Sequence, residues 1–131
     1  MLRILFGLTL ILNASFVLAN EDIGYVGETG KVFGYEHVED ALNSLKSNKN
    51  TEISEIQGWT MISDNENREM WSFPPKSHQA YPSVIRRAVV EKNGQIGIGT
   101  QVSCGAKKDA CDSLMKDFIE LNNQIRKDIN G

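Results

Sequence analysis

The chain has few cysteines and prolines and no excess of basic residues. Among its 131 residues are two cysteines, three prolines and two histidines, and the formal net charge is −3. Nucleic-acid binding and docking on anionic lipid both need a basic face, so neither partner is expected. Structural zinc sites use about four nitrogen or sulfur ligands, whereas His37, His78, Cys104 and Cys111 are spread along the sequence. We therefore predict no metal, and we interpret both histidines as surface residues.

Motifs that would indicate catalysis are also missing. The sequence contains no Gly-x-Ser-x-Gly segment and no His-Glu-x-x-His segment. Residues 27–31 resemble a phosphate-binding loop, but Tyr25 stands where its first glycine belongs, and Val32 where Ser or Thr would bind magnesium. Residues 64–68 are acidic in part but lack the glycine and distal glutamate of a calcium loop. The sequence therefore predicts a non-enzymatic domain without a cofactor.

The N-terminal residues have the pattern of a secretory signal peptide. Arg3 is followed by an apolar stretch over residues 4–17, which leads into a Val-Leu-Ala segment. This order of charge, apolar run and small residue predicts cleavage between Ala19 and Asn20. An uncleaved anchor is the alternative, but a spanning helix needs about 20 apolar residues and this run is shorter. We expect residues 1–19 to be removed, leaving a periplasmic or secreted protein without a stable membrane anchor.

The residues after the signal peptide are predicted to form a leader and one domain. Residues 20–34 contain four glycines, several charges and few apolar side chains. This composition indicates a flexible leader, with at most a short strand near residues 31–33. Residues 35–131 have the length of a single small domain.

Two segments of this domain have helical periodicity. Residues 38–46 place apolar side chains on one face, which predicts a short helix that ends by residues 47–50. Residues 107–129 have the same spacing and predict a long C-terminal helix. The apolar stripe of the first consists of Val38, Ala41, Leu42 and Leu45, and that of the second of Ala110, Cys111, Leu114, Phe118, Leu121, Ile125 and Ile129.

The segments between the helices favour strands. Residues 51–56, 59–63 and 69–73 are predicted strands, and Asn93-Gly94 predicts a hairpin because a type I′ turn needs positive φ at both central residues. The predicted register pairs Glu91 with Ile96, Val89 with Ile98, Arg87 with Thr100 and Ile85 with Val102.

The side chains of this hairpin divide between two faces, because they alternate along a strand. One face is predicted to be the core face, and the other is small, mixed and more exposed. The predicted core face carries Ile85, Val89, Ile96, Ile98, Val102 and Cys104. The expected fold class is α+β, with a small antiparallel sheet packed against the long C-terminal helix and the shorter N-terminal helix.

Cys104 and Cys111 are expected to form a disulfide. An exported protein meets an oxidising compartment, and the sequence offers no other cysteine to pair. Cys104 lies on the predicted core face and Cys111 on the inner face of the long helix, so a bridge would attach that helix to the last strand. A redox or metal pair is the alternative, although redox motifs favour Cys-x-x-Cys.

Two segments resemble those of a known family. Residues 71–75 are Trp-Ser-Phe-Pro-Pro, and residues 78–87 are His-Gln-Ala-Tyr-Pro-Ser-Val-Ile-Arg-Arg. With the two late cysteines, they resemble an uncharacterised family of small exported bacterial proteins that carry Trp-Ser-Phe-x-Pro and Ala-Tyr-Pro-x-Val-x-(Lys/Arg)-Arg segments. The resemblance covers roughly residues 35–125. It implies secretion and a shared fold and supplies no activity.

The candidate residues for binding a ligand or partner lie around the proline-rich loop. Trp71, Phe73 and Tyr81 are expected to cluster there, either as a contact surface or, as we favour, as part of the core. Arg86 and Arg87 must face opposite sides of their strand. Arg86 is expected to be the solvent residue, whereas Arg87 should reach the rim or find a carboxylate partner. Either arginine could anchor an anion.

These observations predict an exported, non-enzymatic domain that acts by binding a protein or a cell-envelope component. One alternative is a small periplasmic hydrolase whose acid–base groups are dispersed in the sequence. Another is a secreted enzyme inhibitor or immunity protein. Convergent titratable groups in a deep pocket would favour an enzyme, and a flat apolar patch would favour a binder.

Overall fold

The computed structural model describes residues 23–25 and 31–130, and the predicted signal peptide lies outside them. It confirms the α+β class with a short and a long helix. In chain order the elements are β1 (Ile23–Tyr25), α1 (Val38–Ser47), β2 (Thr51–Ile56), β3 (Trp59–Asp64), β4 (Glu69–Phe73), β5 (Ser83–Lys92), β6 (Gln95–Cys104) and α2 (Lys108–Asn130).

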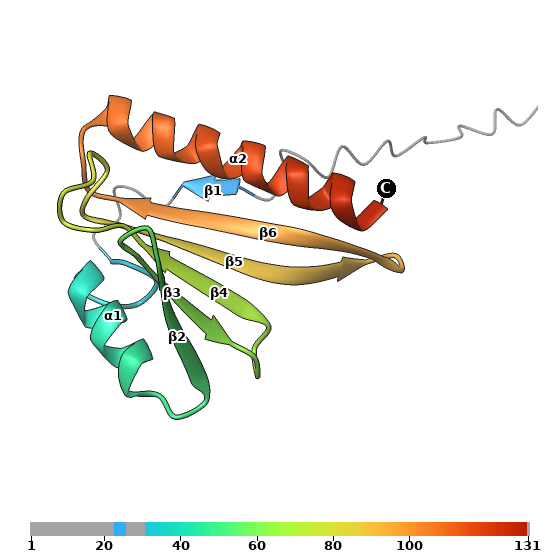
Figure 1. The fold of residues 1–131 in the computed structure, drawn as a ribbon, viewed down its shortest axis with the longest axis horizontal. Coiled ribbons are helices and arrows are strands. Elements are labelled where there is room, and N and C mark those ends of the chain that lie inside the picture. The colour runs from blue at the N-terminus through green and yellow to red at the C-terminus, as the bar shows by residue number, and fades with distance from the viewer. Residues whose placement is uncertain (1–22, 26–30, 131) are drawn as a thin grey trace, which may run out of the picture.

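One six-stranded sheet organises the molecule, in the order β1-β6-β5-β4-β3-β2 (Figure 1). Strands β2 to β6 form a continuous antiparallel meander, because each pairs with the next strand in the chain. β1 is the exception, since it pairs in parallel with the outer edge of β6. The meander keeps sequence neighbours adjacent in space, so most of the sheet depends on short turns.

The β5–β6 hairpin has the predicted register. Asn93 and Gly94 have φ values of 55° and 79°, as a type I′ turn requires. A second pair with positive φ, Gln57 and Gly58, joins β2 to β3. All four predicted hairpin pairs are confirmed: Glu91 with Ile96, Val89 with Ile98, Arg87 with Thr100 and Ile85 with Val102.

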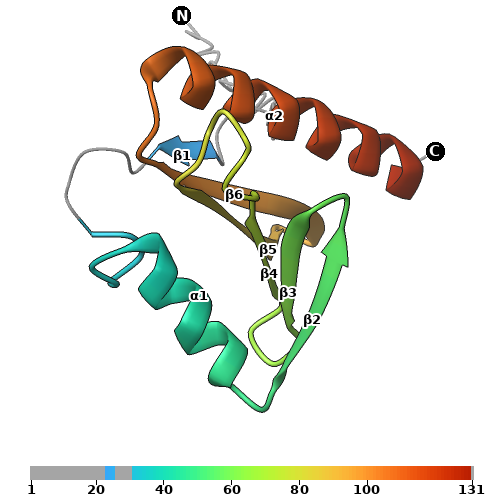
Figure 2. The ribbon, with the colours of Figure 1, turned by 60° about the vertical axis from the view of Figure 1, so that its left-hand side comes forward.

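The two helices lie on opposite sides of the sheet (Figure 2). Each helix covers its own apolar cluster, so the domain has three layers and two cores. The cluster under α1 contains Ala41, Leu45, Ile62, Trp71, Phe73 and Val84. The cluster under α2 contains Ala80, Ile85, Val102, Cys104, Cys111, Leu114 and Phe118.

The prediction of a single core face for the hairpin is therefore wrong. Val84 belongs to the face predicted to be more exposed, yet it is fully buried under α1. On the predicted core face, Val89 and Ile96 are 45% and 67% exposed. Both lie towards the hairpin turn, whereas the cluster under α2 gathers around the other end of the strands. The exposure of the hairpin side chains therefore depends on their position along β5 and β6 as well as on the face of the sheet.

The predicted flexible leader is partly ordered. Residues 23–25 form β1, and Val32 pairs with Tyr35 through two backbone hydrogen bonds of 2.7 and 2.9 Å. Val32 and Phe33 also pack against the cluster under α1. The structured domain thus includes residues on the leader side of the predicted boundary at residue 35.

Helix α2, with 23 residues, is the longer of the two helices in the described part of the chain. Polar and charged side chains recur along its length, and only one stripe faces the sheet. Among the residues that the structure describes, no helix has the length and apolar character needed to cross a membrane.

Candidate functional site

The predicted bridge between Cys104 and Cys111 is present, with the two Cα atoms 5.9 Å apart. It connects the last residue of β6 to the first turn of α2. Both cysteines are buried, at 3% and 1% exposure, within the cluster under α2. The bridge therefore fixes the start of α2 over the sheet and has no exposed sulfur for redox exchange.

Trp71 and Phe73 lie inside the cluster under α1, at 6% and 3% exposure. The ring of Phe33 meets Trp71 edge to face, with the centroids 5.5 Å apart. Neither candidate presents its ring to solvent. Their position agrees with the core interpretation of the sequence.

Tyr81 is not in the cluster that contains Trp71 and Phe73, so the predicted grouping of all three is wrong. It is half-buried and lines two open grooves. One groove, of about 390 Å³, lies by the first residues of α1 and is lined by His37, Glu39 and Asp40 among others. The Asp40 carboxylate there accepts the backbone N–H of His37 at 3.1 Å, so it caps the helix.

His78 is half-buried, which corrects its interpretation as a surface residue. Its Nδ1 accepts the backbone N–H of Ala80 at 3.0 Å, and its ring meets that of Trp59 with the centroids 5.1 Å apart. His78 therefore stabilises the loop before β5. His37 is exposed, as predicted.

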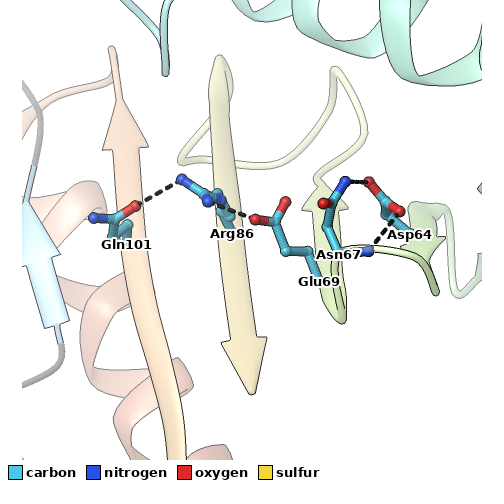
Figure 3. A network of polar contacts seen from close by, with 5 residues as sticks. All are labelled: Asp64, Asn67, Glu69, Arg86 and Gln101. Carbon is cyan, nitrogen blue, oxygen red and sulfur yellow. Dashed lines mark hydrogen bonds and ion pairs between the residues drawn. The ribbon is translucent and has the colours of Figure 1, made fainter. Parts of the chain in front are cut away.

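Arg86 belongs to a polar network on the α1 face of the sheet (Figure 3). Its Nη2 forms an ion pair with Glu69 at 2.5 Å, and its Nη1 donates to the side-chain oxygen of Gln101 at 3.3 Å. The guanidinium also lies 5.6 Å from the ring of Trp71 and 6.0 Å from that of Phe33. The sequence predicts that the Arg86 side chain points into solvent, but it contacts a carboxylate and two aromatic rings instead. Its contacts are structural.

Asp64 lies near these residues, beside the β3–β4 turn, and forms a separate pair with Asn67 (Figure 3). Its carboxylate accepts the side-chain Nδ2 of Asn67 at 2.8 Å and the backbone N–H of Asn67 at 3.1 Å. These hydrogen bonds, led by that from the side chain of Asn67, lower the pKa of Asp64 below its ordinary value.

Arg87 lies on the opposite face of β5 and has no such partner. It is only 9% exposed, and its guanidinium carbon lies 5.4 Å from the centroid of the Phe118 ring. Nη2 donates to the thioether sulfur of Met70 at 3.3 Å, a weak acceptor, and the buried Nε has no acceptor in the described part of the chain. The expected carboxylate partner is absent from residues 31–128, and the residue does not reach the rim. Burial lowers the pKa of Arg87.

Arg87 lines a cavity of about 380 Å³ on the α2 face of the sheet, which we call the Arg87 cavity. Four large apolar side chains line it as well, from β4, β5, β6 and the C-terminal half of α2. Arg68 supplies a second cation from the β3–β4 turn. The apolar side chains are Met70, Val89, Ile98 and Ile125.

Two acidic residues, Asp64 and Glu69, also line this cavity. Strand alternation places both side chains on the α1 face, since Asp64 pairs with Glu69 and Glu69 pairs with Ala88. There the two carboxylates are engaged by Asn67 and Arg86. Neither is a counter-ion for Arg87.

A buried polar pair lies beside Arg87. Asn122 of α2 donates its Nδ2 to the hydroxyl of Thr100 at 2.7 Å, and Thr100 is the cross-strand partner of Arg87. The Oδ1 of Asn122 is buried without a donor partner in the described residues. The sequence placed Leu121 in the apolar stripe, but Leu121 is 37% exposed and Asn122 is 5% exposed. Asn122 continues the helical spacing of Cys111, Leu114 and Phe118, and this spacing is the sequence signal that predicts its burial.

Residues 31–128 contain no group of three or more His, Cys, Asp or Glu side chains that could hold a metal ion.

Comparison with known proteins does not identify a family, because the chain matches no protein-family model, no curated protein and no solved structure. The resemblance to small exported bacterial proteins therefore stays a prediction.

Proposed function

We propose that this chain is an exported, non-enzymatic binding domain whose ligand occupies the Arg87 cavity. One observation carries the proposal: Arg87, only 9% exposed and without a carboxylate partner in the described residues, lines an open cavity with partly apolar walls. A buried charge is costly unless it is paired. Because the fold supplies no partner among these residues, an external anion is the natural one.

Export is supported by two features of the chain. The charge, apolar run and small-residue end of residues 1–19 have the signal-peptide pattern. The disulfide between Cys104 and Cys111 is typical of proteins from oxidising compartments. Together they favour a periplasmic or secreted location, where the ligand would be a component of the envelope or its surroundings.

The composition of the cavity favours binding over hydrolysis. Dispersed acid–base catalysis would need a free carboxylate or histidine facing the cavity. The acidic residues that line it are hydrogen-bonded or ion-paired elsewhere, and neither His37 nor His78 lines it. The remaining side chains that line the cavity are cationic, apolar, or carry an amide or a hydroxyl group. Such side chains can bind a molecule.

Native mass spectrometry of the protein, purified undenatured from the compartment to which it is exported, tests the proposal. We expect a protein that begins at Asn20 and carries a non-covalent small molecule. The Arg87→Gln variant should lose this molecule, while Lys127→Gln, which removes an exposed positive charge from α2, should keep it. A protein that retains Met1 would contradict export. Equal occupancy in the two variants would contradict the assignment of the site.

A further inference from the structure

We infer that the ligand of the Arg87 cavity is an aliphatic monocarboxylate, with its carboxylate at Arg87 and its chain against Met70, Val89, Ile98 and Ile125. The inference rests on the proposed function and specifies the chemical class of the ligand. Charge, hydrogen-bond geometry and size each support it.

Charge selects a monovalent anion. Arg87 contributes one positive charge to the protein interior, and no anionic group among residues 31–128 forms an ion pair with it. Arg68, the second cation that lines the cavity, is exposed and solvated by water, so a single carboxylate is enough to neutralise the buried charge of Arg87. Burial weakens the competition from water and makes the added ion pair stronger than at the surface.

Hydrogen-bond geometry selects a carboxylate. The guanidinium carbon lies 5.4 Å from the centroid of the Phe118 ring, a cation–π contact that needs no hydrogen bond from the N–H groups. Among the described residues, the buried Nε has no acceptor, and Nη2 has only the Met70 sulfur at 3.3 Å. A carboxylate offers two coplanar oxygens, which match the donor fork of an arginine in a bidentate pair.

The walls of the cavity select an aliphatic chain. Val89 and Met70 are 45% and 36% exposed, and Ile98 and Ile125 are half-buried. An aliphatic chain lying against them would remove apolar surface from water, which is favourable in proportion to the area covered. The cavity of about 380 Å³ has room for such a chain, and we take decanoate as the probe.

Isothermal titration calorimetry with decanoate tests the inference on the disulfide-bonded mature protein. Decanol keeps the chain without the charge, acetate keeps the charge without the chain, and decyl phosphate replaces the carboxylate by a phosphate. We expect decanoate to bind at least about tenfold more tightly than each of the three, since a neutral, truncated or mismatched ligand loses one of the contacts above.

Two variants probe the two ends of the ligand. Arg87→Gln should weaken decanoate binding at least about thirtyfold, because removing one partner of a buried charge pair is costly. Val89→Asp places a negative charge at an exposed position beside the aliphatic chain of the ligand. It should weaken decanoate binding at least about tenfold. Lys127→Gln should bind like the wild type. Circular dichroism and urea unfolding verify that each variant is folded. If Arg87→Gln does not fold, the loss of decanoate binding in Val89→Asp still tests the site.

Several results would overturn the inference. Equal affinity for decanoate and decanol would show that Arg87 does not select the anion, and equal affinity for decyl phosphate would reject the carboxylate. Decanoate binding that appears only in the Glu21→Gln, Asp22→Asn double variant would mean that carboxylates of the chain itself are the partner of Arg87. A small molecule retained through Arg87 in native mass spectrometry, combined with no decanoate binding, would reject the ligand class and leave the proposed function standing.

Discussion

Arg86 and Arg87 are consecutive residues of β5 whose side chains lie on opposite faces of the sheet. Arg86 is in register with Trp71 and forms an ion pair with Glu69. Arg87 is the more deeply buried of the two and meets Phe118 and the sulfur of Met70 instead of a carboxylate. One arginine is thus paired with a carboxylate, and the other has no carboxylate partner among the described residues.

The first prediction concerns Trp71, which is buried in the cluster under α1. We expect Trp71→Ala to lower the free energy of unfolding by about 3–5 kcal/mol, because truncating a buried aromatic leaves a cavity. Tyr81→Ala, a matched change at a half-buried position outside both apolar clusters, should cost less, about 1 kcal/mol. Urea unfolding of both variants measures the difference. A Trp71→Ala protein as stable as the wild type would contradict the core assignment.

The second prediction concerns the bridge between Cys104 and Cys111. Replacing both cysteines by serine should lower the free energy of unfolding by about 2–3 kcal/mol, since a bridge over so short a loop restricts the unfolded chain only modestly. Reducing agent should shift the urea midpoint of the wild type and leave that of the double variant unchanged. A reductant effect on the double variant would show that the shift has another origin.

The third prediction is a coupling between Asn122 and Thr100. Asn122→Leu and Thr100→Val should each cost about 1–3 kcal/mol, because each leaves the other polar group buried without its partner. The double variant should cost less than the sum of the two, as both polar groups are then removed together. A double-mutant cycle by urea unfolding measures the coupling. Strict additivity would contradict a direct interaction.

The fourth prediction concerns the pH dependence contributed by Asp64. Its pKa is lowered in the folded state, chiefly by the side chain of Asn67, so its charged form stabilises the fold above the ordinary pKa near 4. Asn67→Ala should therefore be less stable than the wild type at neutral pH, by about 1 kcal/mol. This gap should shrink as the pH falls through the lowered pKa of Asp64.

Urea unfolding from pH 7 down to the lowest pH at which both proteins remain folded measures this gap. Asn65→Ala, an exposed neighbour in the same turn, is the control, and its stability should run parallel to that of the wild type. A gap between Asn67→Ala and the wild type that stays constant with pH would reject the link to Asp64.

The sequence by itself determined the local structure, because the signals for it lie within a few residues of one another. The Asn93-Gly94 turn sets the register of β5 and β6, and helical periodicity located α1 and α2. The bridge between Cys104 and Cys111 followed from the presence of only two cysteines. Each of these features depends on backbone geometry or on composition, which the sequence states directly.

Only the tertiary structure decided which side chains are buried. Both faces of a strand alternate in the same way, so the pattern around Val84 and Val89 did not reveal where each helix lies or how far it covers the hairpin. The same limit applies to Asn122, whose burial depends on its hydrogen bond to Thr100 of another element. It applies most to Arg86 and Arg87, since their environments come from residues distant in the sequence: Glu69 for one, and Phe118 with the cavity wall for the other.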